Sequence, residues 1–221
     1  MKEKGIEADP NLINFNYRRK KKTMIQQNKI TTAQKAILGT VQLGMEYGIS
    51  NVRGKPTKQE SFSILSEAWQ RGIRWFDTAP SYGSEELLGE FFASHGIVEE
   101  ARITTKIPSL KKVRRKKEAL RRSIDDSLKL LNVPRIDILF FHDPADSLIL
   151  LEEPRFFEEL LVVMPVISLG ASVYEPEEIK RLRLCAFDLA FQFPFNVLDR
   201  RFEYMKSYRG KRFARSVLLQ G

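Results

Sequence analysis

Seven apolar runs recur along the chain at intervals of about 20 to 40 residues, with amphipathic stretches between them. We predict strands at these runs, residues 36–43, 74–79, 102–107, 136–142, 166–172, 187–192 and 215–220. The runs are mostly continuous rather than alternating with polar residues. Continuous runs are typical of strands that are buried on both faces of a parallel sheet.

The stretches between the strands carry apolar residues at helical spacing. Thr57 and Glu60 have the spacing of a capping box, and they open a helix whose apolar face includes Leu65 and Trp69. Further helices are predicted at 84–94, from about 113 to 131, at 152–162, after Glu175 and at 196–207. Alternating strands and helices indicate an α/β protein with a parallel sheet.

The number of units favours a (β/α)8 barrel of the TIM type over a doubly wound sheet. No Gly-x-Gly-x-x-Gly motif follows the first run, as a dinucleotide-binding doubly wound fold would require. A closed barrel has eight strands in about 250 residues. We therefore expect an incomplete barrel over residues 31–221, with about seven βα units and without the eighth strand and final helices. Its first and last strands would be open edges, which favours self-association.

The net charge of +9 comes from two local clusters rather than from a basic domain. Residues 1–23 carry +4 and residues 111–122 carry +7, so the remainder sums to −2. Residues 1–30 lack apolar periodicity and are expected to form a basic, disordered tail. Neither cluster has interleaved aromatic residues for stacking on bases, so specific nucleic-acid recognition is not expected. The second cluster is interpreted as a solvated helix face.

The cysteine and histidine content excludes a disulfide-stabilised domain and the usual zinc-binding domains. One Cys cannot form an intrachain disulfide, and one Cys with two His cannot assemble the usual zinc sites. The most apolar stretch, 160–173, is interrupted by Pro165 and Gly170 and is too short to span a bilayer. The expectation is a cytoplasmic protein with no metal and no membrane partner.

Chemically useful side chains stand at the ends of successive runs. Asp77, Lys106, His142, Ser172 and Gln192 end or nearly end the second to sixth runs. Taken alone, Asp77 is explained as a carboxylate that caps the following turn. The carboxyl ends of parallel barrel strands meet at one rim, however, where active sites form. We therefore expect these side chains to converge, with Tyr82 reaching them from the loop after Asp77.

A phenol, an ammonium, a carboxylate and an imidazole on one rim form a proton-transfer site. A tyrosine pKa of about 10 is high for a proton donor, and a neighbouring ammonium lowers it. We expect Asp77 to hold Lys106 charged beside Tyr82, and His142 to orient a substrate carbonyl. Ser172 and Gln192 suit a carboxamide group. The set is suited to protonating an oxygen on which negative charge builds.

The motifs around these residues resemble those of the aldo-keto reductase family over residues 36 to 221. The resemblance rests on Leu38-Gly-Thr-Val-Gln, Asp77-Thr-Ala-Pro-Ser-Tyr-Gly-Ser-Glu-Glu-Leu-Leu-Gly89, Thr104-Thr-Lys-Ile, Asp137-Ile-Leu-Phe-Phe-His-Asp-Pro, Gly170-Ala-Ser, Gln192-Phe-Pro-Phe-Asn-Val-Leu-Asp and Arg215-Ser-Val-Leu-Leu-Gln-Gly. It implies reduction of a small-molecule aldehyde or ketone with NADP(H), and a catalytic tetrad of Asp77, Tyr82, Lys106 and His142. It also implies cofactor contacts from Thr40, Ser172, Gln192 and Ser216.

Three departures accompany this resemblance. Val173 stands where many members have an Asn that contacts the carboxamide, and Arg215 stands where an aromatic residue often stacks on the nicotinamide. The expected absence of an eighth strand removes the part that holds the adenosine phosphate in the family.

Three other functions remain open at this point. The barrel could be a binding or regulatory module with vestigial catalysis. Lys106 could form a Schiff base in an aldolase or lyase. The basic clusters could bind polyanions, although such an attraction would be weak and salt-sensitive.

Overall fold

The computed structural model describes residues 36–49 and 51–219, so the predicted basic tail over 1–30 lies outside the described residues. Its strands are β1 (Ile37–Gly39), β2 (Trp75–Asp77), β3 (Arg102–Ile107), β4 (Ile138–Phe141), β5 (Leu169–Ser172), β6 (Ala190–Pro194) and β7 (Arg212–Arg215). Its helices are α2 (Val41–Gly44), α3 (Lys58–Gln70), α4 (Glu85–Ser94), α5 (Lys116–Leu131), α6 (Ile149–Glu152), α7 (Pro154–Val163) and α8 (Pro176–Leu182). Short 3₁₀ turns are η2 (Pro80–Tyr82), η3 (Asp146–Leu148) and η4 (Glu203–Ser207).

Local sequence signals set several of these boundaries. Thr57 caps α3 by accepting from the Glu60 backbone N–H, while the Glu60 carboxylate accepts from the Thr57 backbone N–H at 2.8 Å. This reciprocal pair is the predicted capping box. Gly72, just beyond the helix, has a φ of +90°, a conformation in which L side chains are strained. The chain can therefore turn directly from α3 into β2.

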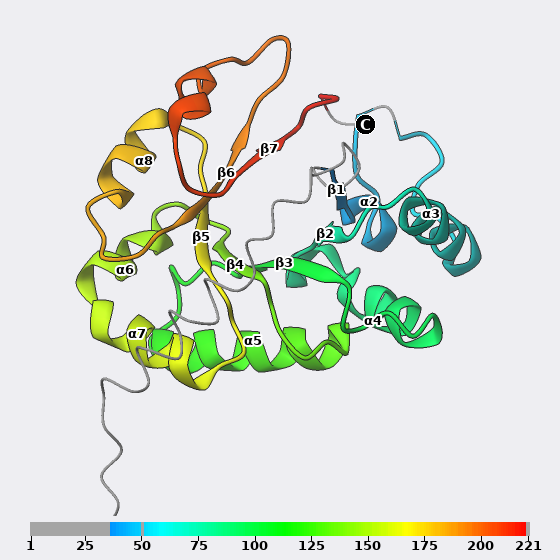
Figure 1. Cartoon of the computed structure of the whole chain (residues 1–221), viewed down its shortest axis with the longest axis horizontal. Helices are drawn as coiled ribbons and strands as arrows, with labels where there is room; N and C mark the ends of the chain where they lie inside the picture. Colours follow the sequence, from blue (N-terminus) through cyan, green and yellow to red (C-terminus); the bar gives the residue numbers. More distant parts are fainter. Residues whose placement is uncertain (1–35, 50, 220–221) are drawn as a thin grey trace, which may run out of the picture.

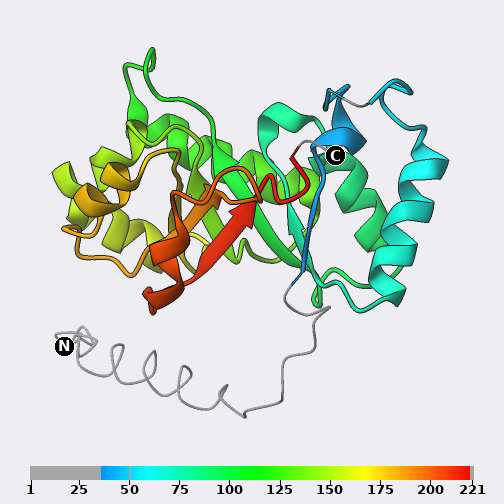
Figure 2. The ribbon, with the colours of Figure 1, turned by 90° about the horizontal axis from the view of Figure 1, so that it is seen from above.

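The seven strands form one parallel sheet in the order β1-β2-β3-β4-β5-β6-β7. Figures 1 and 2 show this sheet curled into a partial barrel, with α3, α4, α5, α7 and α8 covering its outer face. The predicted incomplete (β/α)8 barrel is thus confirmed as the fold class. Strand order and direction bring all seven carboxyl ends to one rim.

Aromatic residues from distant strands fill the inside of the curl. Phe213 of β7 lies 6.1 Å from Trp75 of β2 and 5.8 Å from Phe140 of β4, measured between ring centres. Contacts between β2 and β7 are possible only because the sheet curls back on itself. Side chains inside the curl therefore contact each other across the gap in the sheet. The backbones of β1 and β7 are not paired among the described residues.

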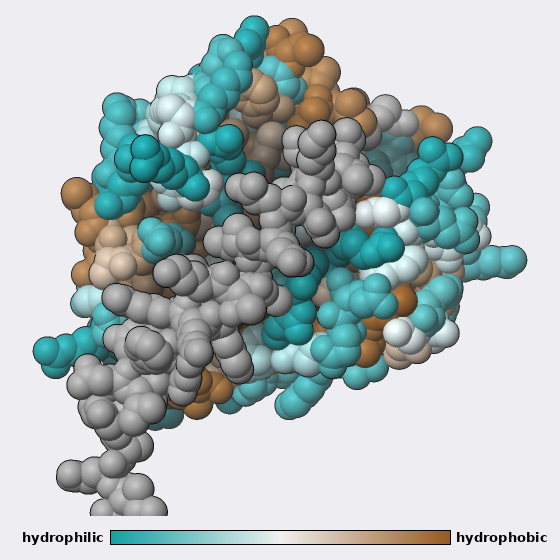
Figure 3. Space-filling model, in the orientation of Figure 1, coloured by the Kyte–Doolittle hydropathy of each residue, from teal (hydrophilic) through white to brown (hydrophobic). Residues whose placement is uncertain are grey.

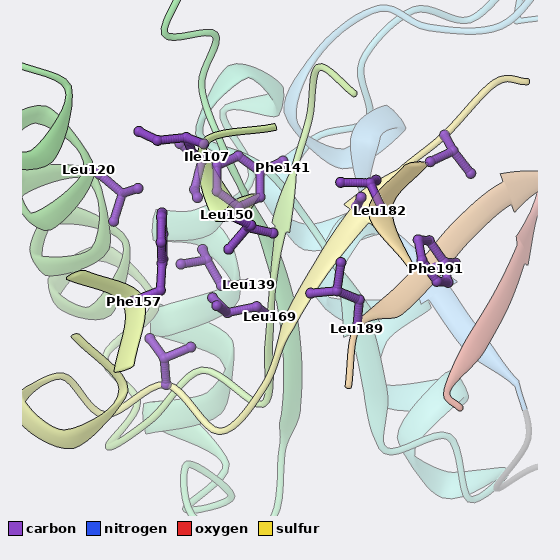
Figure 4. Packing of buried hydrophobic residues seen from close by; sticks show 14 of the residues in the cluster. Ile107, Leu120, Leu139, Phe141, Leu150, Phe157, Leu169, Leu182, Leu189 and Phe191 are labelled. Atoms are coloured by element: carbon purple, nitrogen blue, oxygen red, sulfur yellow. The ribbon is translucent and has the colours of Figure 1, made fainter. Parts of the chain in front are cut away.

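The larger core lies between the sheet and the outer helices. Figure 4 shows Leu139, Phe141 and Leu169 of the strands facing Leu120 of α5 and Phe157 of α7. A second cluster joins α3 and α4 to β2 and β3 through Leu65, Phe76, Leu88, Phe91 and Ile103. These two layers hold the strand ends in fixed positions.

Several predicted elements differ from the structure. The first strand, predicted at 36–43, ends at Gly39, and Val41–Gly44 form the short helix α2. Residues 196–207 form no α-helix, and only η4 is present in that stretch. Asn196 Oδ1 accepts from the backbone N–H groups of Leu198 and Asp199 at 2.8 and 2.9 Å, which forms a turn in competition with helix. The last strand, predicted at 215–220, is β7 (Arg212–Arg215), which begins three residues earlier and ends five residues earlier. Val217 and Leu218 follow it as exposed residues, because no neighbouring strand pairs with them within the described part.

Exposed apolar side chains gather beside the open part of the sheet. Val197 and Leu198, in the loop after β6, are 83% and 80% exposed. Figure 3 shows hydrophobic surface over this loop at the top of the view. With β1 and β7 as edges, the expectation of self-association stays a prediction. No helix in the described ranges is both long and apolar enough to cross a bilayer.

Replacing Phe157 with alanine is expected to lower the free energy of unfolding by about 3–5 kcal/mol. Its ring is fully buried and lies 5.0 Å from Phe156 and 5.9 Å from Phe141 between ring centres. Val162→Ala in the same helix is the control, because Val162 is 80% exposed and should change stability by less than about 0.5 kcal/mol. Urea unfolding measures both, and equal effects would contradict the assigned core.

Candidate active site

A buried ion pair joins the ends of β2 and β3. Lys106 Nζ lies 2.9 and 2.8 Å from the two carboxylate oxygens of Asp77, and it also donates to the Thr78 carbonyl at 2.9 Å. The Lys106 side chain is 2% exposed. Register pairs Asp77 with Thr104, so residue 106 lies two positions further along on the same face. The three donors of the ammonium are all satisfied.

Two further side chains complete the surroundings of Asp77. The Thr104 hydroxyl donates to Asp77 Oδ1 at 2.7 Å, and Gln192 Nε2 donates to the same oxygen at 3.0 Å. Gln192 comes from β6, on the opposite side of the curl. The Asp77 carboxylate on β2 is therefore oriented by donors from two other strands, β3 and β6.

Tyr82 and His142 lie over this pair. Lys106 Nζ is 4.8 Å from the centre of the Tyr82 ring, and the Tyr82 and His142 ring centres are 6.1 Å apart at 88°. Tyr82 ends η2 after β2, and His142 directly follows β4. The structure thus brings together Asp77, Tyr82, Lys106 and His142, the four residues grouped from the sequence.

Burial sets the protonation of both rings. Burial raises the pKa of Tyr82 above 10.0, while the nearby Lys106 charge opposes that rise. The pKa of Tyr82 is therefore raised rather than lowered as expected, because burial destabilises the phenolate more than the Lys106 ammonium stabilises it. Burial, and then the Lys106 charge, lower the pKa of His142 below 6.5. At neutral pH, Tyr82 is therefore a neutral phenol and His142 a neutral imidazole.

A chain of hydroxyl groups fixes the loop that carries Tyr82. The Thr40 hydroxyl donates to the Asp77 carbonyl at 2.9 Å and lies 2.9 Å from Ser84 Oγ. Ser84 Oγ is in turn 2.9 Å from the Thr78 hydroxyl. Each hydroxyl has one proton, so Ser84 must donate to Thr40, and Thr78 to Ser84. The sequence analysis included Ser84 in the Asp77–Gly89 motif but did not assign it to the site.

Glu85 is a second residue that the sequence analysis did not identify. It is buried at the start of α4, and its carboxylate accepts from the Thr105 hydroxyl at 2.7 Å. Burial raises its pKa. Thr105 lies on the outer face of the sheet, opposite to Thr104 and Lys106. Its bond to Glu85 therefore ties the start of α4, just after the Tyr82 loop, to the outer face of β3. Its signals in the sequence were its place in the Asp77–Gly89 motif and at a helix start, and neither assigned it this contact.

Among the residues expected to contact a cofactor, Ser172 and Gln192 lie side by side. They are paired in register on β5 and β6, and both are buried. Gln192 Oε1 is buried without a hydrogen-bond partner among the described residues, while its Nε2 is used by Asp77. Gln192 Oε1 is therefore an acceptor that a ligand could use. The Thr40 hydroxyl uses its proton and one acceptor position within the protein, and its expected cofactor contact stays a prediction.

The other expected cofactor residues lie at the end of β7. Ser216 is exposed with a φ of +55°, and its carbonyl accepts from Asn196 Nδ2 at 3.2 Å. The Arg215 guanidinium stacks on the Tyr174 ring, 4.2 Å from its centre. Val173 is fully buried and supplies only backbone bonds. No metal-binding group of three or more His, Cys, Asp or Glu occurs in residues 36–49 and 51–219.

Comparison with known proteins identifies the family of the chain. The model of the Aldo/keto reductase family matches residues 35–208, most of the chain. The chain belongs to the aldo/keto reductase family. Aldo-keto reductase YhdN of Bacillus subtilis is 28% identical over 175 residues, covering 75% of this chain and 51% of YhdN. D-threo-aldose 1-dehydrogenase from a Pseudomonas species is 30% identical over 140 residues, covering 49% and 42%.

The fold is also shared with solved structures of family members. A Bombyx mori aldo-keto reductase in complex with NADP has a TM-score of 0.63 at 22% identity, covering 82% of this chain and 62% of that one. This chain spans about half the length, or less, of the curated relatives it matches.

Gly44→Ala is expected to displace the Tyr82 loop and lower the free energy of unfolding by about 1–3 kcal/mol. A Cβ at Gly44 would overlap the Tyr82 carbonyl oxygen and lie 2.7 Å from Ser84 N. Gly39→Ala is the matched control, since nothing lies within 4 Å of a Cβ there. Denaturant unfolding of both variants measures the difference. If Gly44→Ala left the free energy of unfolding unchanged, the close packing of Gly44 against the Tyr82–Ser84 backbone would be contradicted.

Proposed function

We propose that this protein reduces an aldehyde or ketone to an alcohol with NADPH, and that Tyr82 is the general acid. The observation that carries the proposal is the buried Lys106 ammonium, held by Asp77 and placed 4.8 Å from the Tyr82 ring, with His142 facing that ring. Lysine is seldom fully buried unless it is paired, and a cluster of titratable groups with shifted pKa values at a strand-end rim is a candidate functional site.

Each of the four residues has a distinct part in this chemistry. Tyr82 donates its hydroxyl proton to the carbonyl oxygen as negative charge develops there. Lys106 stabilises the phenolate that remains, and Asp77 holds the ammonium charged and in place. Neutral His142 donates a hydrogen bond that orients the carbonyl.

The residues present fit a nicotinamide. The buried, unpartnered Gln192 Oε1 offers an acceptor to a carboxamide NH₂, and the Ser172 hydroxyl lies beside it in register. Thr40 would act indirectly, by holding the Asp77 carbonyl, and Ser216 would meet the cofactor beyond β7. Bound NADPH would supply the hydride. The Bombyx mori relative, which was crystallised with NADP, supports this choice.

The arrangement of Lys106 argues against the Schiff-base alternative. A nucleophilic lysine must be uncharged, and its amine must reach a carbonyl carbon. Lys106 instead uses its three donors on Asp77 and Thr78 and is buried by them. A proton-holding role therefore explains this geometry better than a covalent one.

Tyr82→Phe is expected to reduce kcat for aldehyde reduction by about 10² to 10⁴-fold, because it removes only the transferred proton. NADPH affinity, followed by fluorescence titration, should stay within about twofold. Tyr204→Phe is the control, since Tyr204 is an exposed tyrosine on η4. Full activity of the Tyr82 variant would refute the assignment. If the unmodified protein showed no turnover and bound a partner protein as well as the Tyr82→Phe variant does, the regulatory-module alternative would be favoured.

The pH profile of kcat/KM for reduction is expected to be flat from about pH 7 to 9 and to fall in more alkaline solution. The pKa of His142 is lowered below 6.5 and that of Tyr82 is raised above 10.0, so neither group titrates inside this range. The acid form of Tyr82 is the active one, which places the loss on the alkaline side. Steady-state rates across buffers measure the profile, and an inflection near pH 8 would contradict it.

A further inference from the structure

A hollow lined in part by His142 could hold the part of the proposed substrate that extends beyond the reacting carbonyl. Its volume is about 320 Å³, and it is lined by Ser109, His142, Asp143, Pro144 and Tyr174. These residues come from the loops that follow β3, β4 and β5, at the rim that carries Tyr82 and Lys106. A carbonyl oriented by His142 would therefore extend the rest of its molecule into this hollow.

Lys111 lies beside the hollow, because it pairs with Asp143, one of the lining residues. Its Nζ lies 2.5 Å from Asp143 Oδ2, which joins the loop after β3 to the loop after β4. The Lys111 side chain is 63% exposed. An ammonium has three donors, so the bond to Asp143 leaves capacity for a second oxyanion.

Arg215 adds a second positive charge near the hollow. Its guanidinium stacks on Tyr174, which lines the hollow, and its charge contributes to the lowered pKa of His142. Arg215 Nε is buried without a partner, and no Asp or Glu oxygen lies within 4.0 Å of its guanidinium among the described residues. Its charge is therefore not cancelled by a local ion pair.

The carboxylates near the hollow are already engaged. Asp77 is bound to Lys106 and Asp143 to Lys111, while buried Asp146 accepts from the Leu110 backbone N–H at 2.7 Å. Lys112, Arg114 and Arg115 are exposed in the same loop as Lys111 and add to the positive field. The loop of residues 111–115 thus carries four basic side chains, while the Asp143 and Asp146 carboxylates act against the charge of Lys111.

The start of α5 at Lys116 divides the basic cluster of residues 111–122 into a loop part and a helical part. On α5, Lys117 pairs with Glu153 at 3.0 Å, and the Arg121 guanidinium lies 5.1 Å from the centre of the Phe156 ring. That part is the solvated helix face expected from the sequence. Residues 111–115 instead precede α5 and lie in the loop at the hollow, which a helix face does not explain.

We infer that the carbonyl substrate carries an anionic group, a carboxylate or a phosphate, which binds beside Lys111 while His142 holds the carbonyl. This inference rests on the proposed reductase function for its reaction, but its binding step can be measured separately. The hollow then selects charged carbonyl compounds over neutral ones of the same shape. Asp143 opposes that selection, since its carboxylate competes for Lys111.

The kinetic test compares 4-carboxybenzaldehyde, 4-formylphenyl phosphate and neutral methyl 4-formylbenzoate as substrates with NADPH. We expect KM for an anionic aldehyde to be at least about fivefold lower than for the ester, with the two kcat values alike. The difference should shrink in 0.5 M NaCl, because salt screens partly exposed charges. Equal KM values for all three aldehydes overturn the inference.

Two variants change the selectivity in opposite directions. Lys111→Gln should raise KM for the anionic aldehydes about fivefold and leave the ester unchanged. Asp143→Asn should lower KM for the anionic aldehydes, because it frees Lys111 and keeps the acceptor that bonds the Ala145 N–H at 2.9 Å. Lys129→Gln is the control, an exposed lysine near the other end of α5. Identical shifts in the Lys111 and Lys129 variants would also overturn the inference.

A binding measurement separates this inference from the proposed function. Calorimetric titration uses 4-carbamoylbenzoate, whose amide carbonyl is not reduced, and its methyl ester, each with and without NADP⁺. Tighter binding of the anion that is lost in Lys111→Gln supports the inference even if no aldehyde is turned over. Turnover without any preference for the anion, in kinetics or binding, retains the reductase and rejects the anionic substrate.

Discussion

The buried ammonium of Lys106 is the constraint on which the rest of the rim depends. Removing a lysine charge from water costs several kcal/mol unless acceptors replace the lost hydration. Asp77 and the Thr78 carbonyl supply those acceptors, and the parallel register of β2 and β3 places them. Asp77 in turn needs orienting donors, which come from Thr104 and from Gln192 across the curl. Satisfying one charge therefore ties together β2, β3 and β6.

The sequence was sufficient for the parts of the fold that follow from local pattern. β3 has the predicted bounds, α3 has its capping box, and the strand-end side chains converge because parallel strands share one rim. It was insufficient for residues 196–207, where apolar spacing indicated a helix. There Asn196 and Asp199 bond nearby backbone N–H groups, and Arg212 donates to the carbonyl of Met205 at 2.8 Å. Such local bonds compete with a helix in ways that spacing does not reveal.

The site was predictable as a set of residues but not as an electrostatic environment. A lysine near a tyrosine indicates a lowered phenol pKa, yet burial reverses the net direction for Tyr82. Burial is a property of the whole fold, so the sequence alone could not supply it. Thr40 shows the same limit, because the hydroxyl chain through Ser84 uses a group that the family resemblance assigned to the cofactor. Ser84 and Glu85 act on the Tyr82 loop from positions that carry little sequence signal.

The open sheet separates two requirements of the proposed reaction. The proton-transfer groups lie on β2, β3 and β4 and their loops, which are paired on both sides and backed by the helices. Thr40 and Ser216 follow β1 and β7, the two edges, and no strand bridges them in the part of the chain that the structure describes. Trp75 and Phe213 nevertheless meet inside the curl, so the inner layer holds these edges in relation to each other. In the proposed reaction, the proton-transfer groups would therefore be placed by the well-paired strands, whereas the position of Thr40 relative to Ser216 would rest on the inner-layer contact between β2 and β7.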